Sequence, residues 1–186
     1  MAFKFGQLIR ENLPGTGPVL VVQFPPANAG AGTRTQRQLD ALRRGLGTSS
    51  KSVLVVSPQE LSPAACSVLV WKIYDGTWGQ ELLSWVTPYP NPRAIVSFMG
   101  FPEDLPAELP QPWPPLLAVY AGRKRPPSKW IERGMALALA ELRPDAALGV
   151  DPSTHATVDE VFNANFTLVM RHCDKPTSIV ATTKPR

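Results

Sequence analysis

Two short apolar runs, Pro18-Val-Leu-Val-Val-Gln-Phe24 and Ser52-Val-Leu-Val-Val56, decide the fold that this sequence predicts. Both runs are rich in β-branched residues and apolar on both faces, which is typical of buried strands in a covered parallel sheet. Between them, leucines recur at helical spacing over residues 34–46, and Gly47 follows where a helix usually ends. Strand, helix and strand in this order predict a βαβ unit with a right-handed crossover.

The rest of the chain continues the alternation of buried strands and amphipathic helices. Residues 64–74 are the exception, because their apolar run fits either a third strand or a helix. The pattern predicts an α/β fold: a single three-layer αβα domain with a mainly parallel sheet of about five strands. Further strands are expected at 93–98, 116–120 and 146–150, and further helices at 79–86, 128–142 and 158–170.

Two of these helices carry explicit start signals. Ser128 is a natural N-cap for the helix over 128–142. Thr157 and Glu160 have the spacing of a capping box ahead of the helix that we expect to run to about Met170.

The order of elements over residues 18–170 resembles that of flavodoxin-like and Rossmann-like domains, and of one lobe of a type I periplasmic binding protein. The resemblance is one of pattern and is carried by no residue motif, so it implies a fold and no activity. The pattern divides the chain into a lead-in over 1–17, the α/β domain over 18–172, and a tail or edge strand over 173–186.

Proline is unusually abundant, with 21 residues, and six of them fall within residues 102–115. Proline fixes φ and removes a donor, so this segment should form a stiff connection. It fits a structural connection packed on its own domain better than a ligand for an aromatic groove, although both remain open.

The net charge of +4 is concentrated in residues 1–51, where seven basic side chains face two acidic ones. Such a surface could meet nucleic acid, anionic lipid or an acidic partner. Apart from Phe3 and Phe5 on either side of Lys4, no aromatic residues interleave with these charges, which argues against nucleic acid and favours a solvated helix face.

Neither compartment nor disulfide pattern is fixed by the sequence. Cys66 and Cys173 lie in unrelated contexts and make no disulfide framework. The N-terminus lacks the features of a signal peptide, and no run of 18 apolar residues could cross a bilayer. The chain is expected to be cytoplasmic if Met1 is its native start and extracytoplasmic if a leader or anchor has been removed.

The first candidate site is the loop after the first strand. Ligands of open α/β sheets bind at the carboxyl ends of the strands. Gly30, Gly32 and Thr33 are small residues that open a helix, where free backbone N–H groups and the helix dipole favour an anion, and Arg34 would strengthen that field. A loop without a ligand is the competing interpretation.

The second candidate is the polar rim formed by later strand ends. Arg123 follows the strand at 116–120, and Asp151 and His155 follow the strand at 146–150. Asp151 and His155 could act as base and orienter or as a polar clamp on a ligand. An ordinary Asp-Pro-Ser turn is the simpler interpretation.

Standard catalytic signatures are each missing a required residue. There is no Gly-Lys-Ser/Thr of a phosphate-binding loop, no third glycine of a dinucleotide fingerprint and no Gly-x-Ser-x-Gly elbow. The two histidines and two cysteines have no zinc-ligand spacing. We therefore assign no catalytic residue, no metal and no cofactor; the question of an enzyme stays open, with the missing signatures arguing against one.

Three functional hypotheses remain. The first is a non-catalytic binding or assembly domain with a protein partner, such as the soluble part of a membrane-attached or multi-subunit complex. The second is a domain that binds a small anion or metabolite at the carboxyl ends of the strands. The third is an enzyme with a non-standard site that uses Asp75, Asp151 or His155.

Overall fold

The computed structural model describes residues 1–23, 29–47, 52–56, 62–106, 108–109, 112–120, 128–143, 163, 166–171 and 176–178. Within these residues the strands are β1 (Val19–Val22), β2 (Val53–Val56), β3 (Ala94–Ser97), β4 (Leu116–Tyr120), β5 (Ala136–Leu142), β6 (Phe166–Arg171) and β7 (Pro176–Ser178). The helices are α1 (Ala2–Asn12), α2 (Ala29–Leu46), α3 (Pro63–Asp75), α4 (Gly79–Val86) and α5 (Ser128–Glu132).

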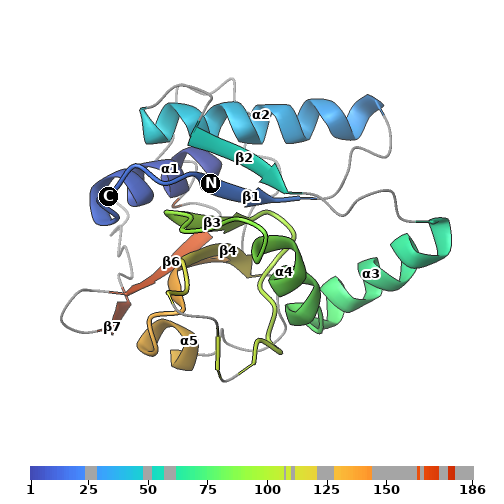
Figure 1. Cartoon of the computed structure of the whole chain (residues 1–186). Coiled ribbons are helices and arrows are strands. Elements are labelled where there is room, and N and C mark those ends of the chain that lie inside the picture. The colour runs from blue at the N-terminus through green and yellow to red at the C-terminus, as the bar shows by residue number, and fades with distance from the viewer. Residues whose placement is uncertain are drawn as a thin grey trace.

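The strands form one sheet in the order β2-β1-β3-β4-β5-β6-β7 (Figure 1). Strands β1 to β5 run parallel, and β6 and β7 add an antiparallel extension beyond β5. This confirms the predicted α/β fold with a mainly parallel sheet. The order 2-1-3-4-5 of the parallel part is that of a flavodoxin-like domain.

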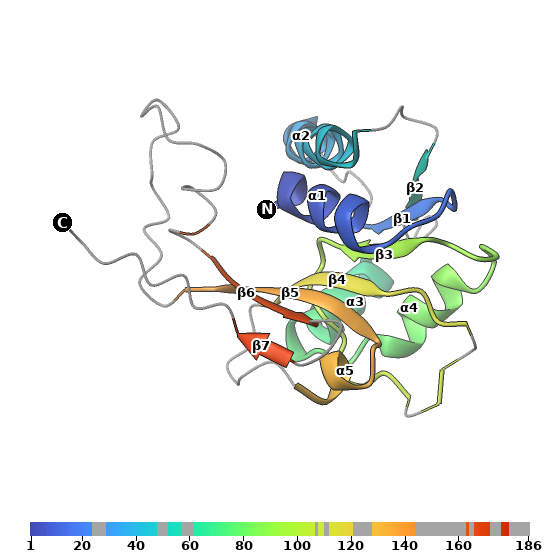
Figure 2. The same cartoon turned by 90° about the vertical axis from the view of Figure 1, so that its left-hand side faces the viewer.

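Helices cover both faces of the sheet, as Figure 2 shows: α1 and α2 lie on one side, and α3, α4 and α5 lie on the other. The strand β1 is buried on both faces, as its run of β-branched residues predicted. Val19 and Val21 belong to the core under α1 and α2, whereas Leu20 and Val22 belong to the core under the opposite helices. The molecule is therefore a three-layer αβα sandwich.

The strand β2 differs from the expectation of a fully buried strand. It is an edge strand, and its middle residues Leu54 and Val55 are 38% and 40% exposed. The residue pattern Val-Leu-Val-Val is the same in β1 and β2, so the difference comes only from position in the sheet.

A close contact between two glycines joins α1 to α2. A Cβ at Gly45 would lie 2.1 Å from the carbonyl oxygen of Phe3, and a Cβ at Gly6 would lie 2.4 Å from that of Leu42. The two backbones can approach this closely only because neither glycine has a side chain. The predicted lead-in thus contains a helix that belongs to the core, with Phe5 and Ile9 fully buried.

The proline-rich segment after β3 packs on its own domain. Leu105 and Leu109 are buried in the core beside α4, and the side chain of Trp113 packs against the same cluster. The interpretation as a structural connection is therefore confirmed for the described part of this segment.

The predicted helix over 128–142 was wrong beyond its first turn. The helix α5 ends at Glu132, and Gly134 takes the left-handed conformation with φ of 76°. The backbone N–H of Met135 donates to the carbonyl of Trp130 at 2.9 Å, which closes the helix end. The chain then enters β5, whose alanines are buried between the two helical layers.

The predicted helix over 158–170 was wrong over its last residues, although residue 163 is helical. Phe166–Arg171 is the strand β6, which pairs antiparallel with β5. Phe166, Leu168 and Met170 alternate along it and pack against the core on the α1–α2 side. The capping box at 157–160 and the strand expected at 146–150 lie outside the described residues.

Two uncertain segments are settled by the structure. Residues 63–75 form the helix α3, so the alternative of a third strand does not apply. In the predicted tail or edge strand, Pro176–Ser178 pairs with β6 as the edge strand β7.

Candidate functional site

The strand order places a topological switch point between β1 and β3. The connection from β1 leads outward to β2, and the connection from β2 returns past β1 to β3, so ligands of such sheets bind where these two strands end. Backbone bonds continue just beyond the strands: the N–H of Phe98 donates to the carbonyl of Val22 at 3.1 Å, and that of Gln23 donates to the carbonyl of Val56 at 3.3 Å.

Gln23 is the polar side chain buried at this switch point. It is 7% exposed, and its Oε1 finds no hydrogen-bond partner in the structure of the described residues. By the alternation of a strand, Gln23 follows Val21 on the face that α1 and α2 cover. A buried acceptor without a partner costs about 1–3 kcal/mol, so it calls for an explanation.

The end of β3, by contrast, is closed by its own hydrogen bonds. The Ser97 hydroxyl donates to the carbonyl of Gly100 at 2.6 Å and accepts from the backbone N–H of Met99 at 3.2 Å. This hydroxyl is occupied in shaping the turn, so it is not offered to a ligand.

The structure describes some of the site residues predicted from the sequence and leaves others outside the described residues. Gly30, Gly32, Thr33 and Arg34 lie in the first turns of α2, which begins at Ala29, rather than in a loop ahead of the helix. Arg123, Asp151 and His155 lie outside the described residues. Asp75, named for a non-standard enzyme site, is the last residue of the helix α3 and is exposed.

The helix α3 begins and ends with local sequence signals. The Ser62 hydroxyl accepts from the backbone N–H of Ala65 at 3.3 Å, and Pro63 occupies the first helical position. Gly76 ends the helix in the left-handed conformation with φ of 72°. These signals could have decided between strand and helix from the sequence.

The outer face of α3 is apolar and exposed. Val68 and Val70 are 57% and 48% exposed, and Trp71 and Tyr74 are 66% and 67% exposed. The two rings meet edge to face, with centroids 6.1 Å apart and planes at 84°. Among the side chains of this helix that the structure describes, Leu69 is the buried one, and Ile73 is packed partly against the same core.

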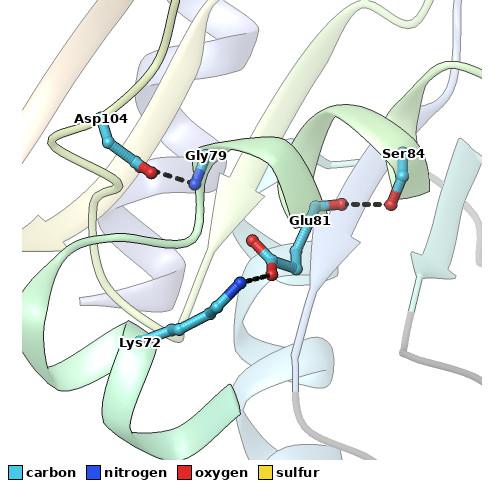
Figure 3. A network of polar contacts seen from close by, with 5 residues as sticks. All are labelled: Lys72, Gly79, Glu81, Ser84 and Asp104. Carbon is cyan, nitrogen blue, oxygen red and sulfur yellow. Dashed lines mark hydrogen bonds and ion pairs between the residues drawn. The ribbon is translucent and has the colours of Figure 1, made fainter. Parts of the chain in front are cut away.

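Polar contacts fix α3 against α4 and the segment after β3 (Figure 3). The Lys72 ammonium pairs with the Glu81 carboxylate of α4. The backbone N–H of Gly79 donates to Asp104 Oδ1 at 2.7 Å, and the backbone N–H of Glu103 donates to the carbonyl of Gly76 at 2.8 Å. The aromatic and valine side chains are therefore presented by an anchored helix. We define Val68, Val70, Trp71 and Tyr74 as the α3 patch.

The described residues offer few other kinds of site. Among the described residues, no three His, Cys, Asp or Glu side chains gather in a way that could hold a metal ion. The helices that the structure describes are all too short or too polar to span a membrane. The α3 patch and the surroundings of Gln23 are the features that remain as candidates.

Comparisons with known proteins give no family. No protein-family model and no curated protein matches the sequence. A solved structure, the periplasmic ribose ABC transporter from Conexibacter woesei DSM 14684, matches with a TM-score of 0.42 and 14% identity, over 76% of this chain and 45% of that chain. The chain thus spans less than half the length of that protein.

Proposed function

We propose that this chain is a non-catalytic binding or assembly domain that contacts a protein partner through the α3 patch. The observation that carries the proposal is the exposure of two aromatic side chains and two valines on one helix. Single exposed apolar residues are ordinary, but a contiguous patch of large ones on a soluble surface marks an interaction site.

The composition of the patch supports a protein partner. Tryptophan and tyrosine are enriched in the cores of protein interfaces and charged residues are depleted there. The patch itself holds no charged residue. Lys72, the nearest cation along the helix, is paired with Glu81. An anchored helix also loses little conformational freedom when a partner binds.

Site-specific photocrosslinking in the cells that produce the chain tests this proposal. A benzoylphenylalanine in place of Trp71 is expected to give a covalent adduct with a protein. The matched control carries the same amino acid in place of Arg37, which is exposed on α2. No adduct from position 71, or the same adducts from both positions, would contradict the proposal.

A second candidate function is supported by Gln23. Its unsatisfied Oε1 lies at the end of β1, on the face where α2 begins. A small ligand that donates a hydrogen bond to Oε1 and accepts from backbone N–H groups in the first turn of α2 would fit this position. Sugars and hydroxyl-bearing phosphate compounds have this chemistry.

A thermal-shift screen separates this candidate from the first. Sugars, nucleotides and inorganic phosphate are added to the chain and to the variant Gln23→Leu. A ligand that prefers the folded chain raises its Tm, and the rise should vanish in the variant. The absence of any shift, with Gln23→Leu more stable than the parent, would show that Gln23 binds none of these ligands and that its burial destabilises the fold.

A further inference from the structure

We infer that the partner of the α3 patch is a second copy of this chain, with the two α3 helices packed antiparallel about a two-fold axis. This inference rests on the proposed function, because it names the partner of the same surface. The spacing, the sizes and the charges of the side chains on α3 support a second copy as the partner.

The exposed residues at the middle of the outer face are spaced for packing against another helix. Ala64, Ser67, Trp71 and Tyr74 follow one another at intervals of three, four and three residues, and each is exposed. This is the spacing of the seam of a coiled coil, where side chains of one helix fit between those of another. We call these four residues the α3 seam.

The seam holds two small residues followed by two large ones, which selects the direction of packing. In a parallel pair, Trp71 would meet Trp71 and Tyr74 would meet Tyr74, while Ala64 and Ser67 would face each other across a void. In an antiparallel pair centred at Leu69, Trp71 of one copy faces Ser67 of the other, and Tyr74 faces Ala64. Large against small is the arrangement that fills space without strain.

The same antiparallel centre places the flanking valines next to their own copies. Val68 of one helix lies beside Val68 of the other on one flank, and Val70 lies beside Val70 on the opposite flank. A surface of this kind is self-complementary, as a two-fold interface requires. No seam residue carries a charge, and Lys72 is held by Glu81, so no like charges oppose the contact.

The area of the seam sets the strength of the contact. A fully buried aromatic side chain removes about 150–250 Å² from water, and Trp71 and Tyr74 still expose two-thirds of theirs. Four such rings in a dimer bury well under the roughly 1,200 Å² at the lower end of stable interfaces. The pair is therefore a concentration-dependent monomer–dimer equilibrium.

Figure 1 shows that α3 lies at the margin of the molecule, away from α1 and α2. A second copy can approach it there with its own α3 while the two sheets stay apart. The contact then joins the two domains through one helix from each.

Sedimentation velocity over a concentration series tests the inference with a compensating exchange. Trp71→Ser leaves a hole opposite Ser67 and is expected to weaken dimerisation by about tenfold or more, as removal of a central tryptophan does. Ser67→Trp crowds Trp71 of the other copy and is also expected to weaken it. The double variant Ser67→Trp/Trp71→Ser restores large against small and should recover the parent's dimerisation.

Two controls distinguish a specific loss of dimerisation from a general loss of surface apolarity or of folding. Leu54→Ser removes an exposed apolar side chain from β2 and should leave dimerisation unchanged. Each variant is also checked by its Tm, since Trp71 is exposed and its replacement should not unfold the monomer.

Three results would contradict the inference or part of it. A parent that stays monomeric up to about 1 mM overturns it, and failure of the double variant to recover overturns the antiparallel register. An adduct from position 71 with a different protein would overturn the second copy as partner while leaving the proposed function standing.

Discussion

The helices on the two faces of the sheet use their apolar residues in opposite ways. On one face, α1 and α2 bury Phe5, Ile9 and Leu42 completely and meet backbone to backbone at Gly6 and Gly45. On the other face, α3 is rich in apolar residues, yet Leu69 is the one buried side chain among those that the structure describes in it.

This difference separates the residues that stabilise the fold from the residues that are available to a partner. A helix that only completes a core turns its large side chains inward, as α2 does. The helix α3 is held by Lys72, by the Gly76 carbonyl and by Leu69, whereas its tryptophan and tyrosine are two-thirds exposed. If this comparison is right, changes inside either core should cost stability and changes on the α3 patch should not.

The largest loss is expected from Trp78, which is fully buried next to Trp85 at the start of α4. Trp78→Ala should lower the free energy of unfolding by about 3–5 kcal/mol, because it removes buried apolar surface and leaves a cavity. Urea denaturation followed by circular dichroism measures this. A loss below about 1 kcal/mol would mean that the core under α4 is loosely packed.

The next largest loss is expected at the helix crossing on the opposite face. Gly45→Ala should lower the free energy of unfolding by about 1–3 kcal/mol, because its methyl group would meet the Phe3 carbonyl. Helix propensity alone predicts a gain of about 1 kcal/mol, so the two explanations differ in sign. Arg44→Ala, one residue away and exposed, is the control and should stay within about 0.5 kcal/mol.

A smaller loss is expected from the contact that fixes the start of α4. Asp104→Ala removes the acceptor for the Gly79 N–H and should cost about 0.5–2 kcal/mol. Asp104→Asn keeps an acceptor at the same position and should recover most of the loss. Equal losses in both variants would mean that this hydrogen bond does not stabilise the fold.

The smallest effect is expected on the α3 patch. Trp71→Ser and Tyr74→Ser should each change the free energy of unfolding of the monomer by less than about 0.5 kcal/mol, because both side chains are two-thirds exposed. Chemical denaturation at low protein concentration measures this. A loss as large as that of Trp78→Ala would place the patch in the core and end its role as an interaction surface.

Continuous β-branched runs and local end signals carried most of the fold prediction. The strand β1 was predictable because its four residues are apolar on both faces, and α4 because its leucines and Val86 recur at helical spacing. The boundary between α5 and β5 was misread because Ile131, Met135 and Ala138 also fit a helical stripe. Gly134 was the signal for the break, and its left-handed conformation decides it.

Exposure was the property that the sequence could not supply. Strands β1 and β2 share the letters Val-Leu-Val-Val, and only the strand order makes one central and the other an edge. In the same way, nothing in the residues of the apolar run over 64–74 says which side of it will be covered. The candidate anion-binding residues from Gly30 to Thr33 were expected in a loop that opens a helix, but they lie in the first turns of α2, since this helix begins at Ala29.

The position of β1 has a consequence for how the chain is made. Both neighbours of this strand, β2 and β3, come after it in the sequence, and β3 follows only after α2, α3 and α4. A ribosome therefore releases Val19–Val22 long before it releases the strand that covers their second edge. Until Ser97 has left the exit tunnel, the centre of the future sheet is an open, wholly apolar edge, the kind of segment that chaperones bind during synthesis.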